Sequence, residues 1–379
     1  MFERIKGDIK RICRYMLVGS TVLVAACNNN ADLTDDNDDV SRQEVILRTF
    51  FSSFYEANEL ATRSLPTGYM RYSELYPSTV PDFTSIRIAM AQDAVASTHY
   101  YNVRLVNDQW KASMDIKDQT YYIYGFMPSE LAGGLTLAKK DGSYANGTTM
   151  TINNLSVLTS ADVCVIVGVK RADEATNIEE AGIQLGQFGI HGSETRNYLY
   201  LLLKHIYAGL HFKAHIDSEY AKLRTIKVKR MTLTTVEEIS EAINLTVSLT
   251  ANDMGADPCG EITYTPQGAS TYASTILYQS DEGFELPVQS PTSFLGCFAP
   301  GRCSKFVLET LYDVYDRKGN LIRKDCTATN KIDAENLGVS KDINELNAGE
   351  IYTIDLKVQP TYLYVLSDPD LDNPTITIE

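Results

Sequence analysis

Residues 350–360 read Glu-Ile-Tyr-Thr-Ile-Asp-Leu-Lys-Val-Gln-Pro, and this stretch decides how the rest of the chain is interpreted. From Tyr352 to Val358, apolar residues alternate with polar ones. Successive side chains of a β-strand point to opposite faces, so a strand here buries the apolar set and leaves the polar set in water. Pro360 has no N–H for a ladder, so the strand should end before it. The segment predicts antiparallel β-structure with one wet face.

The same alternation returns in several other places. It runs through 306–314. The turn sequence Asp-Arg-Lys-Gly follows at 316–319, and a second run follows at 320–323. Together they predict a hairpin. Ile226 and Val228 alternate with lysines, so we expect the lysines on the outward face of a strand. Short segments of period two, separated by Gly, Pro, Asn and Asp, indicate an all-β protein.

The segment 198–212 fits either a helical face or a strand, and we expect a strand, with a short helix over 218–223. A turn-rich stretch at 252–260 precedes renewed strand signals. We therefore place a domain boundary near residue 240, which gives a first domain over 43–240 and a second over 241–379.

Composition excludes one large class of partners. The chain has 379 residues with 34 Lys+Arg against 49 Asp+Glu, a formal net charge of −15, and 44% hydrophobic residues. Such a hydrophobic content suits globular domains. Nucleic-acid binding needs a cationic surface that displaces counterions, so nucleic acid is not an expected partner.

The amino terminus has the order of an export signal. Five basic residues precede the apolar run 16–26, which ends in Ala25-Ala26 and is followed directly by Cys27. We interpret 1–26 as a lipoprotein signal peptide, because the arrangement resembles the bacterial lipobox, in which the cysteine receives a diacylglycerol. Cys27 is then a lipid anchor on the outer membrane. A plain signal peptide followed by an incidental cysteine is the alternative.

Residues 27–42 contain four asparagines and a group of aspartates, with too little apolar content to fold. They predict a flexible acidic tether. A short acidic stretch after the lipidated cysteine also resembles the signal that sends Bacteroidetes lipoproteins to the outer face of the outer membrane, although any solvated spacer would look similar.

No residue pattern supports an enzyme or a cofactor. His205, His211 and His215 have a spacing that could suit zinc, but no HExxH sequence accompanies them, and we expect no metal site. The aspartates at 368–372 lack the glycine that a calcium loop needs. Paired carboxylates of a glycosidase stay open, because their pairing is spatial.

The cysteines allow only partial pairing. Beyond Cys27, five remain, an odd number. Cys297 and Cys303 could close a small disulfide loop in an oxidising compartment, or they could be buried free thiols, as Cys164 could be in its apolar run.

Four segments together resemble the fimbrillin-type subunits of Bacteroidetes pili, the type V pilins. They are the tyrosine-rich strand that closes with a proline at 121–128, the run Leu-Lys-His-Ile-Tyr-Ala-Gly-Leu-His-Phe at 203–212, the strand entry at 347–354, and its continuation at 360–365. In the second segment Gly209 stands where the family usually has a basic residue. The segments are spread over most of 43–379, and only their order is specific.

The resemblance implies two transthyretin-like antiparallel β-sandwich domains that assemble by strand exchange. In polymerising members an arginine-specific protease removes the first strand, here Val45–Tyr55, and the terminal segment of the next subunit, here Tyr362–Glu379, replaces it. The best arginine for this cleavage is Arg63, with Arg48 as a weaker choice. Arg63 could instead lie uncut in an exposed loop, and the terminal segment could be an edge strand of its own domain.

We therefore expect a lipid-anchored structural or adhesive pilus subunit at the cell surface, without catalytic activity. Its expected partners are other pilin subunits, the outer membrane and a surface ligand of a host or another bacterium. The rival hypothesis is a surface lipoprotein that binds or processes glycans, with exposed tyrosines and Trp110 stacking on sugars.

Overall fold

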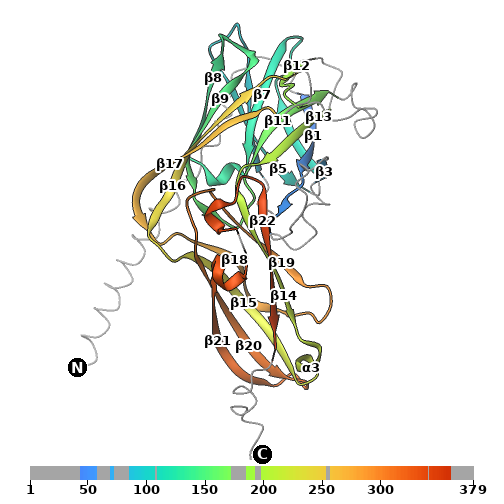
Figure 1. The fold of residues 1–379 in the computed structure, drawn as a ribbon. Coiled ribbons are helices and arrows are strands. Elements are labelled where there is room, and N and C mark those ends of the chain that lie inside the picture. Colours follow the sequence, from blue (N-terminus) through green and yellow to red (C-terminus); the bar gives the residue numbers. More distant parts are fainter. Residues whose placement is uncertain are drawn as a thin grey trace, which may run out of the picture. The chain divides into compact units, whose positions relative to one another are not determined.

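The computed structural model describes residues 43–57, 69–71, 85–106, 109–171, 185–192, 198–252, 257–339 and 341–359. Cys27, Arg63 and Tyr362–Glu379 lie outside these ranges. By its contacts, Arg42–Glu379 forms one compact unit. Its described part is built almost entirely of β-strands arranged in four sheets (Figure 1). The expected all-β fold class is confirmed.

The first sheet, sheet A, closes on itself. Its strands follow the order β11, β13, β1, β6, β5, β4, β7, and β7 pairs back onto β11 through Phe126 and Met127. Two short strands, β3 and β12, pair with β1 and β7 from outside this ring. The bounds are β1 Gln43–Ser52, β3 Tyr69–Arg71, β4 Ser85–Ala91, β5 His99–Val106, β6 Gln109–Met114, β7 Thr120–Met127, β11 Cys164–Arg171, β12 Gly189–His191 and β13 Tyr198–His205.

The ring encloses a hydrophobic core of its own. Alternate residues of its strands point inward, as the period of two requires. Trp110 is one of them, and only 4% of its surface is exposed. The inward set includes Val45, Leu47, Phe51, Ile86, Ile88, Met90, Val103, Trp110, Ile123, Ile166, Leu201 and Leu203.

The other three sheets have four or five strands each. Sheet B has the order β10, β19, β14, β22, β2, and its β14–β22 and β22–β2 pairs are parallel. Sheet C (β17, β16, β9, β8) and sheet D (β18, β15, β20, β21) are antiparallel. The bounds are β2 Tyr55–Glu56, β8 Gly134–Lys140, β9 Ser143–Ser156, β10 Leu158–Thr159, β14 Ala208–Ile216, β15 Arg224–Thr235, β16 Ile239–Thr250, β17 Cys259–Thr271, β18 Ser274–Glu285, β19 Thr292–Phe298, β20 Phe306–Asp316, β21 Leu321–Ile332 and β22 Glu350–Val358.

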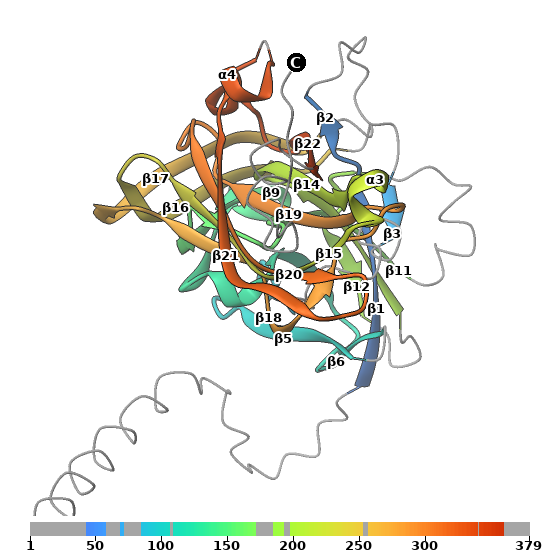
Figure 2. The ribbon, with the colours of Figure 1, turned by 90° about the horizontal axis from the view of Figure 1, so that it is seen from below.

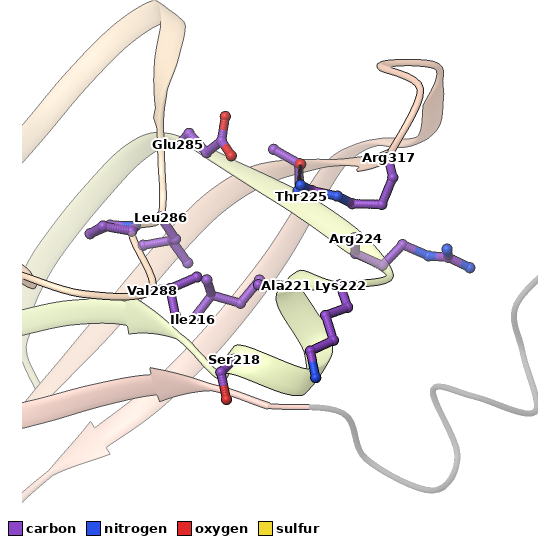
Figure 3. A pocket seen from close by; sticks show the side chains of 11 residues that line it. Ile216, Ser218, Ala221, Lys222, Arg224, Thr225, Glu285, Leu286, Val288 and Arg317 are labelled. Atoms are coloured by element: carbon purple, nitrogen blue, oxygen red, sulfur yellow. Dashed lines mark hydrogen bonds between the residues drawn. The ribbon is translucent and has the colours of Figure 1, made fainter.

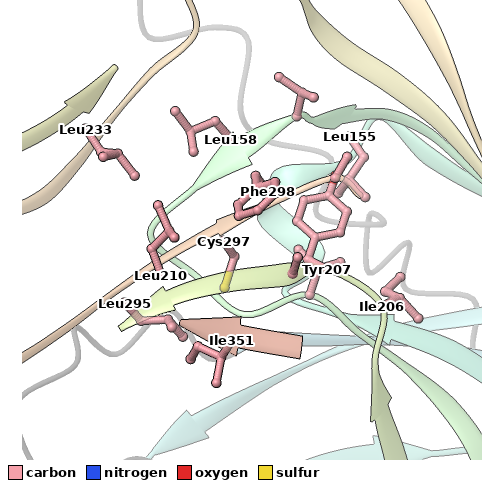
Figure 4. Close-up of a cluster of buried hydrophobic side chains, with 14 of the residues drawn as sticks. Leu155, Leu158, Ile206, Tyr207, Leu210, Leu233, Leu295, Cys297, Phe298 and Ile351 are labelled. Carbon is pink, nitrogen blue, oxygen red and sulfur yellow. The ribbon is translucent and has the colours of Figure 1, made fainter. Parts of the chain in front are cut away.

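A second hydrophobic core joins these sheets to the outer face of the ring. Tyr124 and Phe126 of β7 belong to it, together with the inner faces of sheets B, C and D. At its centre, Tyr207 and Phe298 pack among leucines contributed by β10, β14 and β15 (Figure 4). The Tyr207 hydroxyl donates to the Ser156 carbonyl at 2.8 Å, so the phenol is buried without losing its hydrogen bond.

The strands predicted from alternation are confirmed. β22 covers 350–358, β20 and β21 form the expected hairpin, and the segment 198–216 forms β13 and β14. The antiparallel pairing expected for 350–358 is wrong, because β22 lies parallel to both of its neighbours, β14 and β2. The helix expected at 218–223 is the shorter α3, Ser218–Ala221, which Asp217 caps by accepting from the Glu219 and Tyr220 N–H groups.

Strands from both sides of residue 240 pair with one another in sheets B, C and D, for example β9 with β16 and β15 with β20. The two-domain division at 240 and the transthyretin-like topology stay predictions.

The remaining helices of the described residues are α4, Ala334–Leu337, and the 3-10 turns Ser129–Leu131 and Ile343–Glu345. Among the described residues there is no helix with the length and apolar character needed to cross a membrane.

Candidate strand-exchange site

The first strand of the described chain, β1, has partners along both edges. One edge pairs in parallel with β13 over Ile46–Phe51. The other edge pairs antiparallel with β6 over Gln43–Leu47 and then with β3 over Phe50–Ser52. The sequence predicted this strand over Val45–Tyr55, and the structure ends it at Ser52.

The side chains of β1 fill the ring. Val45, Leu47 and Phe51 are 1%, 2% and 0% exposed and belong to the core inside the ring. Phe50 points the other way and joins the second core. Arg48 is exposed, and its guanidinium lies over the Tyr198 ring, 5.3 Å from the centroid.

Without β1, the ring would open. The facing backbones of β13 and β6 would lose their hydrogen-bond partners, and the pocket that holds Leu47 and Phe51 would fill with water. Unpaired backbone groups beside an exposed apolar trough are what an incoming strand satisfies. β1 therefore fills a slot between β13 and β6 as one extended segment with apolar residues at alternate positions.

After β1 the chain enters sheet B. Tyr55 N donates to Gly349 O at 2.9 Å and Ala57 N to Ile351 O at 2.7 Å, which places β2 along the start of β22. In Figure 2 the blue β2 lies beside the red β22. Among the described residues β2 is the only strand on this edge of β22, and its pairing stops at Ile351.

A buried polar cluster lies at the junction of β1, β11 and β13. His205 Nδ1 lies 2.7 Å from Asp162 Oδ2, and Cys164 Sγ donates to the same oxygen at 3.1 Å. On its other side the His205 ring donates from Nε2 to the Ser52 carbonyl. Burial, and then the Asp162 carboxylate, raise the pKa of the Cys164 thiol, so this side chain is a hydrogen-bond donor rather than a thiolate.

Asp162, Cys164 and His205 also carry three donor types that bind transition metals, with donor atoms within 4.8 Å of one another. A structural zinc site has four ligands. The described residues add no fourth such side chain to the group, and its three donors already hydrogen-bond among themselves. We therefore assign the cluster to hydrogen bonding.

The structure separates the three histidines that the sequence analysis grouped. His205 is buried on β13, whereas His211 lies on β14 with Nδ1 3.4 Å from Thr353 Oγ1. His215 contacts Asp355, with 2.8 Å between Nε2 and Oδ1. The sequence analysis missed Asp162 as the partner of His205. The one signal for it was the Asp-x-Cys spacing at 162–164, which puts both side chains on the same face of an extended segment.

Cys27 and Arg63, the two predicted site residues, and the predicted donor segment Tyr362–Glu379 lie outside the described residues. Cys297 and Cys303 are both free and buried, so no disulfide joins them. The glycan hypothesis requires Trp110 to stack on a sugar. Trp110 lies inside the ring and is not available for this contact.

A surface cavity of about 530 Å³ lies beside α3 (Figure 3). Its apolar side includes Ile216, Leu286 and Val288, and its charged side chains have both signs. Lys222 is engaged by Glu219 at 2.6 Å, and Arg317 donates to Thr225 at 3.3 Å. The mixed charge selects no single class of ligand. The charged side chains that line the cavity are Lys222, Arg224, Glu285 and Arg317.

No family model matches the chain, and no curated protein matches it. Solved structures that resemble it include proteins of Bacteroides described as fimbrial proteins or candidate adhesins. A fimbrial protein from Bacteroides vulgatus is 12% identical, with 83% of this chain and 95% of that chain covered and a TM-score of 0.25. A candidate cell adhesion protein from Bacteroides uniformis is 13% identical, with 83% and 94% covered and a TM-score of 0.34. Another from Bacteroides fragilis is 10% identical, with 84% and 94% covered and a TM-score of 0.36.

Proposed function

We propose that the protein is a structural and adhesive subunit of a bacterial surface pilus, and that it assembles by strand exchange at the position of β1. The observation that carries the proposal is the place of β1 in the chain and in the ring. It is the first described strand, and it is paired on both edges and buried inside. One cut between β2 and β3 can remove β1 together with the two-residue β2 without dividing any later strand.

Arg63 lies between β2 and β3 in the sequence, so cleavage there separates β1 and β2 from the rest of the chain. The slot of β1 and the start of the β22 edge would then be free together. An incoming strand that pairs with β13 and β6 and fills the pockets of Val45, Leu47 and Phe51 would close the ring again. Such a joint opens slowly, because separation exposes the core of the ring.

The donor in this proposal is the terminal segment Tyr362–Glu379 of a second subunit, in which Ile376 and Ile378 alternate with threonines. Export through the signal peptide 1–26 and acylation of Cys27 would hold the subunit at the cell surface until it is assembled. No cofactor and no catalytic step are needed, because the assembly energy comes from backbone pairing and apolar burial.

The proposal is tested by cutting a soluble protein of residues 28–379 with an arginine-specific protease. We expect a ladder of detergent-resistant oligomers on gels after a single cut at Arg63, confirmed by mass spectrometry. Arg63→Lys keeps the charge but removes the recognised residue, so it should stay monomeric. Arg48→Lys is the matched control and should form the ladder. Failure of the wild-type protein to polymerise after complete cleavage, or an unchanged ladder from Arg63→Lys, would overturn the proposal.

A further inference from the structure

The end of β1 is held by His205 through two contacts. The His205 side chain donates from Nε2 to the Ser52 carbonyl, and the His205 backbone N–H donates to Ser52 Oγ at 3.4 Å. Ser52 is the last residue of β1. The carboxyl end of this strand is therefore tied to β13 by a side chain as well as by the ladder.

Asp162 holds the opposite side of the His205 ring. The side chains of His205 and Asp162 are 1% and 2% exposed, and their contact is 2.7 Å long. A hydrogen bond that is shielded from water is electrostatically stronger than the same bond in water. Because the carboxylate binds Nδ1, it fixes the ring in the orientation that aims Nε2 at Ser52.

Phe54 covers the face of the same ring. The centroids of Phe54 and His205 are 3.8 Å apart, and the planes are inclined by 15°. The chain that leaves β1 therefore contacts His205 twice, by a hydrogen bond to its edge and by stacking on its face. The hydrogen bond comes from Ser52 and the stacking from Phe54, the two residues on either side of Ser53.

The cluster also lies where the ring closes. Cys164 of β11 faces His205 of β13 on one side and Met127 of β7 on the other. The β7–β11 pairing that completes the ring consists of only two residue pairs. The contact that holds the end of β1 is thus built into the seam of the ring.

We propose that His205, oriented by Asp162, is the latch that keeps the carboxyl end of β1 in place. A strand leaves a sheet by fraying from a free end. A cut at Arg63 creates that free end on the side of β1 where His205 binds Ser52, so the latch controls how fast β1 is released. The latch itself is a property of the uncut chain, and only its part in assembly rests on the proposed strand exchange.

Hydrogen exchange of the uncut protein tests the latch. We compare wild type with His205→Leu, which loses both ring contacts, and with Asp162→Asn, which keeps the size of the side chain and an acceptor oxygen but not the charge. His211→Gln is the matched control on the neighbouring strand β14. Amides of 46–51 report on β1, and amides of 226–233 on β15 report on the whole fold.

We expect the β1 amides of His205→Leu to exchange about tenfold faster or more, because the loss of a buried hydrogen bond changes an opening equilibrium by about this factor. Asp162→Asn should give a smaller increase, and His211→Gln none. The β15 amides should be unchanged in all three. Equal acceleration of β1 and β15 would show a general structural role, and unchanged β1 amides would show no role, so either result overturns the latch. If His205→Leu does not fold, Asp162→Asn carries the same comparison.

A second measurement separates the latch from the proposed function. After cleavage at Arg63, the protein is diluted so far that no second subunit supplies a donor, and the rate at which residues 28–63 leave it is followed by size-exclusion chromatography. The released fragment should appear faster in the latch variants than in wild type and His211→Gln. If the cleaved wild-type protein never polymerises, but the β1 amides of the latch variants exchange faster than those of wild type, the pilus proposal alone is refuted. If the cleaved wild-type protein polymerises, but the β1 amides of the latch variants exchange at the wild-type rate, the latch alone is refuted.

Discussion

Gly125 of β7 lies directly against the carbonyl oxygen of Arg87 on β4, and a Cβ added to Gly125 would be 2.1 Å from that oxygen. The two strands pair at this point, with Ile88 opposite Gly125. Because the obstructing atom belongs to the backbone, the sheet itself must move. We expect Gly125→Ala to destabilise the protein by about 1–3 kcal/mol or more. Gly134→Ala is the control, since the nearest atom to its Cβ is 3.9 Å away. Urea unfolding of the two variants measures the difference, and equal midpoints would contradict the close approach.

The loss of stability caused by truncating a β1 side chain should depend strongly on the face of the strand that this side chain occupies. Leu47 is buried inside the ring, whereas its neighbour Arg48 is exposed. We expect Leu47→Ala to cost about 2–5 kcal/mol of unfolding free energy. Arg48→Ala should cost less than about 1 kcal/mol, because Arg48 is exposed and loses only its contacts with two tyrosine rings. The measurement is denaturant unfolding of residues 28–379. Similar losses for both variants would mean that β1 does not sit in the ring in this register.

Glu350 should make the protein sensitive to acid. Burial acts to raise the pKa of Glu350, but hydrogen bonds from Lys341 Nζ and from the Asn347 N–H outweigh burial and lower the pKa below its ordinary value. A carboxylate whose pKa is lowered in the folded state stabilises the protein above its unfolded pKa, and this stabilisation is lost as the pH falls through the folded pKa. Glu350→Gln should therefore be less stable than wild type at pH 7, with the difference shrinking at low pH. Thermal unfolding from pH 7 to pH 3 shows this, and a difference that stays constant over the range would contradict it.

The cysteines beyond residue 27 should all be reduced in the folded protein. Burial raises the pKa of Cys303 to about 12, and the pKa of Cys297 is also raised by burial. We expect both thiols to resist alkylation in the folded state and to react once the protein is unfolded without reductant. Intact mass after alkylation of unfolded 28–379 should show five added groups, one for each free cysteine. Three added groups would show that one pair had formed a disulfide.

Cys27 is the predicted anchor, and its acylation is a direct prediction. Full-length protein expressed in a Gram-negative host with labelled palmitate should carry the label and fractionate with the outer membrane. Cys27→Ala should lose both properties, while Cys13→Ala, which lies within the predicted signal sequence, should keep them. Label on the Cys27→Ala protein would contradict the lipoprotein interpretation.

Local pattern was sufficient to predict many of the strands. The alternation in 350–358 and the turn at 316–319 depend on neighbours in sequence, and β22 and the β20–β21 hairpin follow from them. Closure of sheet A has no such local signal. It depends on Phe126 and Met127 meeting Val165 and Cys164, and on β1 choosing a parallel partner in β13. Pairing over such distances is decided by packing of the whole chain.

The same limit applies to the candidate site. His205 was noticed in the sequence because its spacing from His211 and His215 could suit zinc, although we expected no metal site there. Its actual partners, Asp162 and Ser52, are 43 and 153 residues away. Residue type alone could not identify them, because any acidic chain offers many carboxylates. The predictions at Cys27 and Arg63 rest on motif and resemblance and still await the experiments above.

The pairing of β2 with β22 has a consequence for how the protein is made. Thr353 donates to Glu56 at 2.8 Å, although 297 positions separate them in the sequence. A chain that crosses a membrane amino terminus first has β2 outside long before β22 has been translocated. Contacts between such distant segments form late and slowly. In the export proposed above, the chain would therefore stay incomplete and prone to aggregation until its last strands emerge.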